Sequence, residues 1–238
     1  MIVLISEAKT QKISNNGQSI PVFVNEAKDL FSHLSKLNKQ EIKKLFNLSD
    51  KMSISVSHYY SNYDDSNRVI NSYQGLVFQN LMVNDWTSAD LNFATNHLFI
   101  LSAMYGILKP TDNITLHRLD FKVDIGINLY DYWSNKVTEY LISHGKVVIN
   151  LASKEYSKMV SLPMINIIFG EIINNKLISK STYSKINRGK MVNIIVKEKI
   201  TTIRELKCIA IDNYIFDQSL SNDNNFYFVK RSVDNNFI

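Results

Sequence analysis

Residues 100–120 read ILSAMYGILKPTDNITLHRLD, and this stretch decides how the chain folds. An apolar run leads into small and polar residues, and Pro110 then stops any regular element because proline has no backbone N–H to donate. We therefore expect a buried strand that ends in a shaped loop. His117 and Arg118 follow, and an imidazole beside a guanidinium suits the binding of a phosphate or carboxylate. A plain turn at Gly106 and a solvated Arg118 explain the same spacing equally well.

On both sides of this stretch, the spacing of apolar residues predicts alternating strands and helices. The strands early in the chain alternate with helices and the later strands cluster, which predicts a mixed α/β (α+β) fold with a central mixed sheet flanked by helices. No Gly/Ser-rich or Pro-rich linker is visible among seven glycines and three prolines, so we expect residues 1–238 to form a single domain with a basic cleft. The predicted strands are residues 1–5, 98–101, 146–150, 164–169, 177–181 and 226–230; the predicted helices are 24–46 in two parts divided near Asn38, one starting at 49, 88–97, 129–141 and 189–198.

The charge of the chain favours anionic partners without identifying them. Lysine and arginine number 27 against 22 acidic residues, which gives a formal net charge of +5. Residues 183–190 combine an aromatic ring, three cations and a glycine, a mixture that suits phosphate contact with stacking on a base. A solvated basic helix face explains this pattern as well. The basic stretch as a whole contains Lys176, Lys180, Lys185, Arg188, Lys190, Lys197, Lys199 and Arg204.

Polar side chains follow the first predicted strand, where the hydroxyls of Ser6 and Thr10 and the ammonium of Lys9 are suited to hold an anion. Lys9 fits a plain surface lysine equally well.

A second polar set, Asn150, Ser153 and Tyr156, follows another predicted strand, and ligands gather beyond strand ends in sheets of this type. Helix capping is the alternative explanation for Asn150 and Ser153.

Standard catalytic and metal-binding signatures are missing from the chain. Its five histidines lack metal-ligand spacing, and no Walker A loop, Gly-x-Ser-x-Gly elbow or Gly-x-Gly-x-x-Gly loop is present. We therefore predict no metal and no cofactor, and the catalytic residues stay unknown. Lys9 and Lys185 are the candidate proton donors, on the condition that burial lowers their pKa.

The chain has one cysteine, Cys208, which we interpret as a buried structural thiol rather than a redox sensor. No secretion signal and no apolar run of about 18 residues occur, so we expect a cytoplasmic protein without a membrane partner.

Residues 100–120 also carry a resemblance to a known family. They match the YaaA family of bacterial peroxide stress proteins, in which an apolar strand is followed by Ser-Gly-Leu-Tyr-Gly, Leu-Arg-Pro-Leu-Asp and Tyr-Arg-Leu. Glu7 stands where the family pattern has proline, Ala103 where it has the first glycine of the turn, and Asn80 where it has another glycine. The matching residues are Ser102, Tyr105, Gly106, Pro110, Asp112, Arg118 and Leu119, and further colinear blocks lie at 4–10, 73–78, 129–133, 148–156, 183–189 and 214–231.

The resemblance implies a protein of the peroxide and oxidative stress response. It implies DNA binding through a basic cleft and a helix-hairpin-helix-like element, on duplex or distorted DNA with low sequence preference, and a role in limiting iron-dependent oxidative damage. Residues 101–108 are the candidate for the hairpin, and residues 185–190 with Arg118 are the candidate DNA contacts.

The alternative is an enzyme that acts on a small anionic or nucleobase-containing molecule in an enclosed polar pocket. A pocket smaller than a duplex favours the enzyme, an open basic groove favours DNA, and a pocket for an extruded base unites the two. The candidate DNA-binding or anion-binding residues are Ser6, Lys9, Thr10, Tyr73, Gly75, Ser102, Tyr105, Gly106, Arg118, Asn150, Ser153, Tyr156, Lys185, Arg188 and Lys190.

Overall fold

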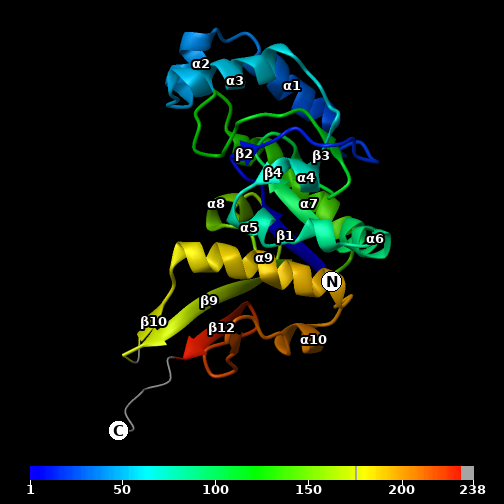
Figure 1. Ribbon diagram of the computed structural model, residues 1–238, viewed down its shortest axis with the longest axis vertical. Coiled ribbons are helices and arrows are strands. Elements are labelled where there is room, and N and C mark those ends of the chain that lie inside the picture. The colour runs from blue at the N-terminus through cyan, green and yellow to red at the C-terminus, as the bar shows by residue number, and fades with distance from the viewer. Residues whose placement is uncertain (175, 232–238) are drawn as a thin grey trace.

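A computed structural model describes residues 1–174 and 176–231, and its centre is one mixed β-sheet (Figure 1). The strand order is β11-β12-β9-β8-β1-β5-β6, with β10 paired to β9. The pairs β8–β1, β1–β5, β8–β9 and β9–β12 are parallel, whereas β6, β10 and β11 are antiparallel to their neighbours. This arrangement confirms the predicted mixed sheet. The strands are β1 Ile2–Ser6, β5 Leu98–Ser102, β6 Gly106–Leu108, β8 Val148–Asn150, β9 Ile165–Ile173, β10 Lys176–Ile178, β11 Ile215–Phe216 and β12 Asn225–Arg231.

Helices flank this sheet, as the sequence predicted. The predicted division near Asn38 is confirmed, because the Asn38 side chain accepts the Gln40 and Glu41 N–H groups and starts the second helix. Ser49 likewise caps the third helix by accepting the Met52 N–H. The helices are α1 Val24–Leu34, α2 Lys39–Leu45, α3 Asp50–Ser61, α4 Val69–Ser72, α5 Leu76–Gln79, the 3-10 turn η1 Val83–Asp85, α6 Ser88–His97, α7 Leu129–Ser143, α8 Lys154–Ser157, α9 Ser181–Lys197 and α10 Ile203–Lys207.

Two short strand pairs complete the fold beside the main sheet. β2 (Thr10–Gln11) pairs with β4 (Tyr73–Gln74), and β3 (Asn67–Arg68) pairs with β7 (Asn113–Ile114). The first pair brings the segment that follows β1 next to the segment that precedes α5.

The hairpin over residues 98–108 corrects the expected helix-hairpin-helix element. Ile100, Leu101 and Ser102 of β5 pair with β6 in antiparallel register, so the turn joins two strands of the main sheet. Gly106 has φ +68°, and a Cβ there would lie 2.6 Å from the Trp133 ring, whose Nε1 donates to the Ala103 carbonyl at 2.8 Å. The family-like Tyr-Gly motif therefore fits a buried β-turn beneath α7, and the assignment of residues 101–108 to a helix-hairpin-helix element is wrong.

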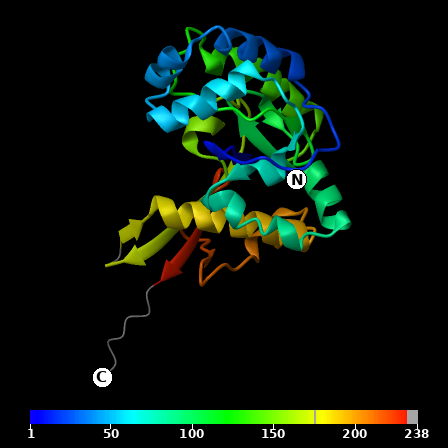
Figure 2. The ribbon, with the colours of Figure 1, turned by 45° about the horizontal axis from the view of Figure 1, so that its top comes forward.

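Helix α9 begins at Ser181, earlier than the predicted start at Gly189, and β10 ends at Ile178, so the predicted strand 177–181 was too long. The first turns of α9 are mostly exposed and polar, so they show no apolar periodicity in the sequence. Figures 1 and 2 both place α9 between α5 and the strands β9 and β12. At Gly189 a Cβ would overlap the Val77 carbonyl oxygen, so glycine permits the close contact between α9 and α5.

Cys208 is exposed, which overturns the expected buried thiol; it lies at the end of α10, and its neighbour Leu206 fills the buried position instead. Within residues 1–174 and 176–231, no helix has both the length and the apolar character needed to span a membrane.

Candidate functional site

A cavity of about 440 Å³ lies between the end of β1, the β4–α5 connection, the segment around α8, and α9. Its apolar side is formed by residues of α5 and by Leu151, and its polar side by hydroxyl and charged groups. The lining residues are Ser6, Glu7, Ala8, Lys9, Thr10, Gln74, Gly75, Leu76, Val77, Phe78, Leu151, Ser153, Glu155, Tyr156, Lys185 and Arg188.

Two serines join the ends of β1 and β8 at this cavity. The Ser6 hydroxyl accepts the Ser153 N–H at 2.8 Å and donates to the Ser153 hydroxyl oxygen at 3.3 Å. Ser153 is the N-cap residue of α8, yet its side chain makes no capping hydrogen bond. Its hydroxyl therefore keeps a proton to donate at the cavity wall.

Arg188 is the largely buried cation of the cavity. Its Nε is buried without a hydrogen-bond partner, and within residues 1–174 and 176–231 its guanidinium forms no ion pair with a carboxylate. Burial lowers the pKa of Arg188 because the low-dielectric surroundings disfavour its charged form. A buried charge without a partner is costly to the free protein.

Lys9 and Lys185 do not meet the burial condition set for a proton donor. The Lys9 side chain is 55% exposed and forms an ion pair with Asp120 at 2.6 Å. Lys185 is exposed on α9 and forms no ion pair within the described part of the chain. Both lysines are exposed cations on the rim of this cavity.

Glu7 carries a buried carboxylate at the end of β1. Its Oε2 accepts hydrogen bonds from the hydroxyls of Ser102 at 2.6 Å and Tyr73 at 2.9 Å, and its Oε1 accepts the Ala103 N–H at 2.7 Å. Ser102 Oγ already accepts the N–H groups of Met104 and Tyr105, so its own proton points to Glu7. These three donors engage both oxygens of the Glu7 carboxyl group and fix its orientation.

His117 faces this carboxylate from the chain that follows β7. Its Nδ1 lies 2.8 Å from the Thr115 carbonyl oxygen and must donate to it, because a carbonyl oxygen only accepts. Its Nε2 then faces Glu7 Oε2 at 3.2 Å, and the two side chains are 1% and 2% exposed. His117 therefore forms a buried pair with Glu7 and does not join Arg118 in the expected anion site.

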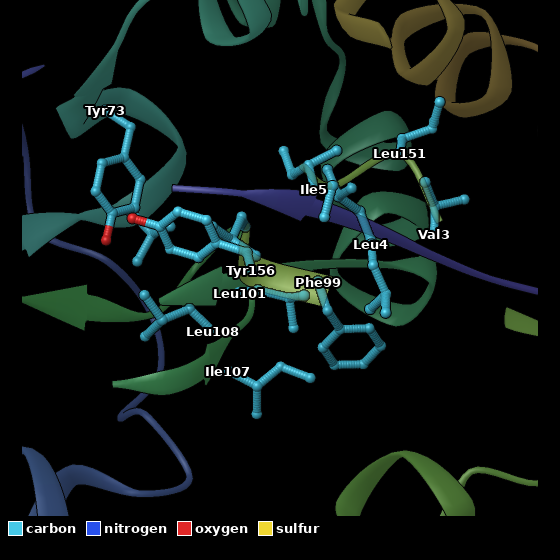
Figure 3. Packing of buried hydrophobic residues seen from close by; sticks show 14 of the residues in the cluster. Val3, Leu4, Ile5, Tyr73, Phe99, Leu101, Ile107, Leu108, Leu151 and Tyr156 are labelled. Carbon is cyan, nitrogen blue, oxygen red and sulfur yellow. The ribbon is translucent and has the colours of Figure 1, made fainter. Parts of the chain in front are cut away.

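Tyr73 and Tyr156 surround the same carboxylate. Figure 3 shows their hydroxyl groups turned toward one another. For each phenol, burial is the main cause that raises the pKa, and the negative charge of Glu7 is the next. Both tyrosines are therefore protonated donors at neutral pH, and Tyr156 lines the cavity itself.

The structure brings together about half of the residues predicted for the site and separates the others. The cavity collects Ser6, Lys9, Thr10, Gly75, Ser153, Tyr156, Lys185 and Arg188. Tyr73 and Ser102 lie behind it on Glu7, whereas Tyr105 and Gly106 are core residues of the turn. Asn150 donates to Asn166 and accepts the Ala152 N–H, Lys190 pairs with Asp212, and Arg118 lies outside the lining.

Sequence reasoning missed Glu7 as part of the site. Two departures from the family pattern could have indicated it. Glu7 places a carboxylate where the pattern has proline, and His117 stands where the pattern has the tyrosine of Tyr-Arg-Leu. The signal was not decisive because residues 7 and 117 are distant in sequence and only the fold brings them together.

Other basic residues of the stretch have carboxylate partners. Lys197 and Lys199 both form ion pairs with Asp90. Lys180 forms an ion pair with Glu171, and Lys190 forms one with Asp212. These pairs neutralise much of the charge that the sequence suggested for a DNA surface.

The residues that the structure describes include no group of three or more His, Cys, Asp or Glu side chains arranged to hold a metal ion.

Comparison with known proteins agrees with the resemblance seen in the sequence. A family model described as peroxide stress protein YaaA matches residues 1–220. A UPF0246 protein of Agathobacter rectalis is 32% identical over 247 residues, which cover 97% of this chain and 99% of the relative. UPF0246 proteins of Clostridium botulinum and Finegoldia magna are 33% and 35% identical, over 96% and 98% of this chain and 98% and 99% of those relatives. The chain therefore belongs to the YaaA family of peroxide stress proteins.

Proposed function

We propose that the cavity binds a phosphate-type oxyanion carried on a molecule of nucleotide size, which is its ligand or substrate. The observation that carries this proposal is Arg188, a largely buried guanidinium without an anionic partner among the described residues. A bound oxyanion would supply that partner, and a guanidinium fork matches two oxygens of a phosphate.

The size of the cavity supports a small ligand. Its volume of about 440 Å³ lies in the range of roughly 300–1,000 Å³ typical of small-molecule sites. A double helix is far larger, since one groove alone admits a whole α-helix. By the criterion of size, a small molecule is favoured over a duplex held inside the cavity.

The lining supports a ligand with two unlike ends. Lys185 and Arg188 attract negative charge at one side, and the Ser153 hydroxyl has a proton to donate. Phe78 and Leu151 offer apolar contact to a flat group such as a nucleobase. A nucleoside monophosphate satisfies both requirements and is the first probe to use.

DNA is the second candidate partner, and exposed residues beside the cavity favour it. Lys176 and Tyr183 are exposed where β10 leads into α9, and Lys185 borders the cavity from the same helix. Backbone phosphates on these residues would allow an extruded base to enter the cavity. A role in limiting iron-dependent oxidative damage, and a cytoplasmic location, stay predictions from the family resemblance and the sequence.

The test compares ligands on the full chain. Inorganic phosphate, adenosine 5′-monophosphate, single-stranded DNA and duplex DNA are titrated against the wild type, Arg188→Met and the exposed control Arg204→Met, over a series of salt concentrations. We expect phosphate and the nucleotide to compete for one site, and Arg188→Met to weaken both by about 100-fold while Arg204→Met leaves them unchanged.

Failure of phosphate and the nucleotide to bind, or equal binding to Arg188→Met, would contradict the proposal. Duplex binding that falls steeply with salt and is displaced by the nucleotide would establish the second candidate instead.

A further inference from the structure

The Glu7–His117 pair is buried beside the cavity without another counter-charge. No lysine or arginine of residues 1–174 and 176–231 forms an ion pair with Glu7, so the imidazole is its one cationic partner there. Ser102, Tyr73 and the Ala103 N–H all donate to the carboxylate, so His117 Nε2 is the atom of the pair that is left to hold a proton between the two side chains.

The surroundings also accommodate the state without that proton. The Gln11 side-chain nitrogen lies 3.3 Å from His117 Nε2. The Gln11 amide is held in this position because its Oε1 accepts the backbone N–H of His117 at 2.8 Å. When Nε2 holds a proton, it donates to Glu7; when the proton leaves, the Gln11 amide donates to the bare lone pair. The pair therefore has two hydrogen-bonded states that differ by one proton.

The pair is connected to the cavity through Glu7 and Tyr156, both of which line it. Figure 3 shows the Tyr156 hydroxyl beside that of Tyr73, which donates to Glu7. A negative charge bound in this cavity is thus close enough to act on the carboxylate and on the proton that balances it.

We infer that the Glu7–His117 pair is the proton-exchanging unit of this cavity, so that a phosphate-type dianion binds together with the uptake of a proton. The inference rests on the proposed function, since it requires that the cavity hold an anion. Its cause is electrostatic: a second negative charge near Glu7 favours the protonated state of the pair.

The proton comes from solvent, and the other titratable groups around the pair do not take it up. The tyrosines already hold their protons, because burial raises their pKa values. The carboxylates of Asp120 and Glu155 are held in ion pairs with Lys9 and Lys122. The titratable groups around the pair are Tyr60 from α3, Tyr73 from β4, Tyr105 from the β5–β6 turn and Arg118 from the chain after β7. Those around the cavity are Lys9 with its partner Asp120, Glu155 and Tyr156 from α8, and Lys185 and Arg188 from α9.

The test titrates the wild type with inorganic sulfate, which stays a dianion throughout the range used. Calorimetry in buffers of different ionisation enthalpy, from about pH 5.5 to about pH 8.5, gives the number of protons taken up per sulfate. We expect uptake that rises toward about one proton as the free protein loses the proton of the pair.

Glu7→Gln is the matched variant, because its amide is neutral and keeps His117 neutral. We expect it to bind sulfate without proton uptake, whereas Asp223→Asn, an exposed change outside the lining of the cavity, keeps the wild-type uptake. If Glu7→Gln does not fold, the wild type labelled with ¹⁵N-histidine gives a second readout. Its ¹⁵N spectra, recorded without and with sulfate, report whether sulfate adds a proton to His117 Nε2.

Sulfate that binds the wild type with no proton uptake at any pH, or an Nε2 signal that sulfate does not change, overturns the inference and leaves the proposed function standing. Sulfate that does not bind at all overturns both.

Discussion

Two parts of the same basic stretch differ in what their cations touch. At the cavity, Arg188 is largely buried and Lys185 is exposed, and neither has a carboxylate partner among the described residues. Toward the other end of α9, Lys197 and Lys199 converge on Asp90. The comparison teaches that pairing, and not the number of cations, decides which part of a basic stretch is free to bind an anion.

The two arrangements also differ in their cost to the free protein. The buried Asp90 carboxylate has two lysines as partners, whereas a buried charge without a partner is destabilising until a ligand neutralises it. In the proposed function a bound anion removes this cost at the cavity, whereas the cations at Asp90 already have their partner.

Gly189→Ala would move α9 and with it the cavity cations, and among the changes that test this comparison it has the largest expected effect on unfolding free energy and phosphate affinity. The new Cβ would overlap the Val77 carbonyl and approach Asn80 Cβ at 2.7 Å. We expect a loss of about 1–3 kcal/mol in unfolding free energy, because overlap outweighs the better helix propensity of alanine, and at least about tenfold weaker phosphate binding as Arg188 shifts.

Urea denaturation and phosphate titration check this result. Gly145→Ala is the control: it has φ +56° and open space, so we expect about 1 kcal/mol of strain and unchanged binding. Equal effects of the two changes would show that α9 does not depend on the close contact.

Lys185→Gln sharpens the comparison from the side of the cavity. An exposed cation at the rim contributes less than a buried one, so we expect phosphate affinity to fall about three- to tenfold, with a smaller difference at high salt. Calorimetric titration measures this, and Lys36→Gln, a change of an exposed lysine that does not line the cavity, serves as control. An unchanged affinity would remove Lys185 from the site.

Asp90→Asn tests the paired end of the stretch through pH. Lys199, followed by the Thr87 N–H and Lys197, lowers the pKa of Asp90 in the folded chain. A lowered pKa contributes stability that is complete above the unfolded value of about 3.9 and is lost as pH falls through the folded value. Wild type should therefore lose stability more steeply than Asp90→Asn below about pH 4.

Urea denaturation at several pH values, with the exposed Asp65→Asn as control, measures that difference. We expect phosphate binding by Asp90→Asn to match wild type. Parallel pH profiles of wild type and Asp90→Asn would contradict the assigned role of the cluster.

Lys190→Gln has the smallest expected effect. Lys190 already pairs with Asp212 at the surface, so its loss should change phosphate affinity by less than about twofold and stability by less than about 1 kcal/mol. A larger loss of phosphate affinity would show that Lys190 belongs to the binding site, as predicted from the sequence.

Much of the fold could be predicted because its signals are local. The apolar runs at β1, β5 and β8 and the caps at Asn38 and Ser49 each depend on neighbouring residues. The start of α9 was missed because its exposed polar turns carry no periodicity, and the turn after β5 was misassigned because a tight Tyr-Gly turn looks alike in a β-hairpin and a helical one.

The site was predictable only in part because it depends on distant contacts. Ser6, Ser153 and Arg188 were found from polar residues after strands and from local charge. The partners that decide their roles were invisible in sequence: Glu7 and His117 meet only in the fold, and Lys190 gains a carboxylate from a residue 22 positions away.

The most direct test of the account is the thermal stability of wild type and Arg188→Met, each with and without inorganic phosphate. If Arg188 is an unpaired buried charge that awaits an anion, the phosphate-free variant melts at or above the wild-type temperature, and phosphate raises the melting temperature of the wild type alone. A phosphate-free variant that melts below wild type, and a phosphate response that is equal in both proteins, would contradict the account.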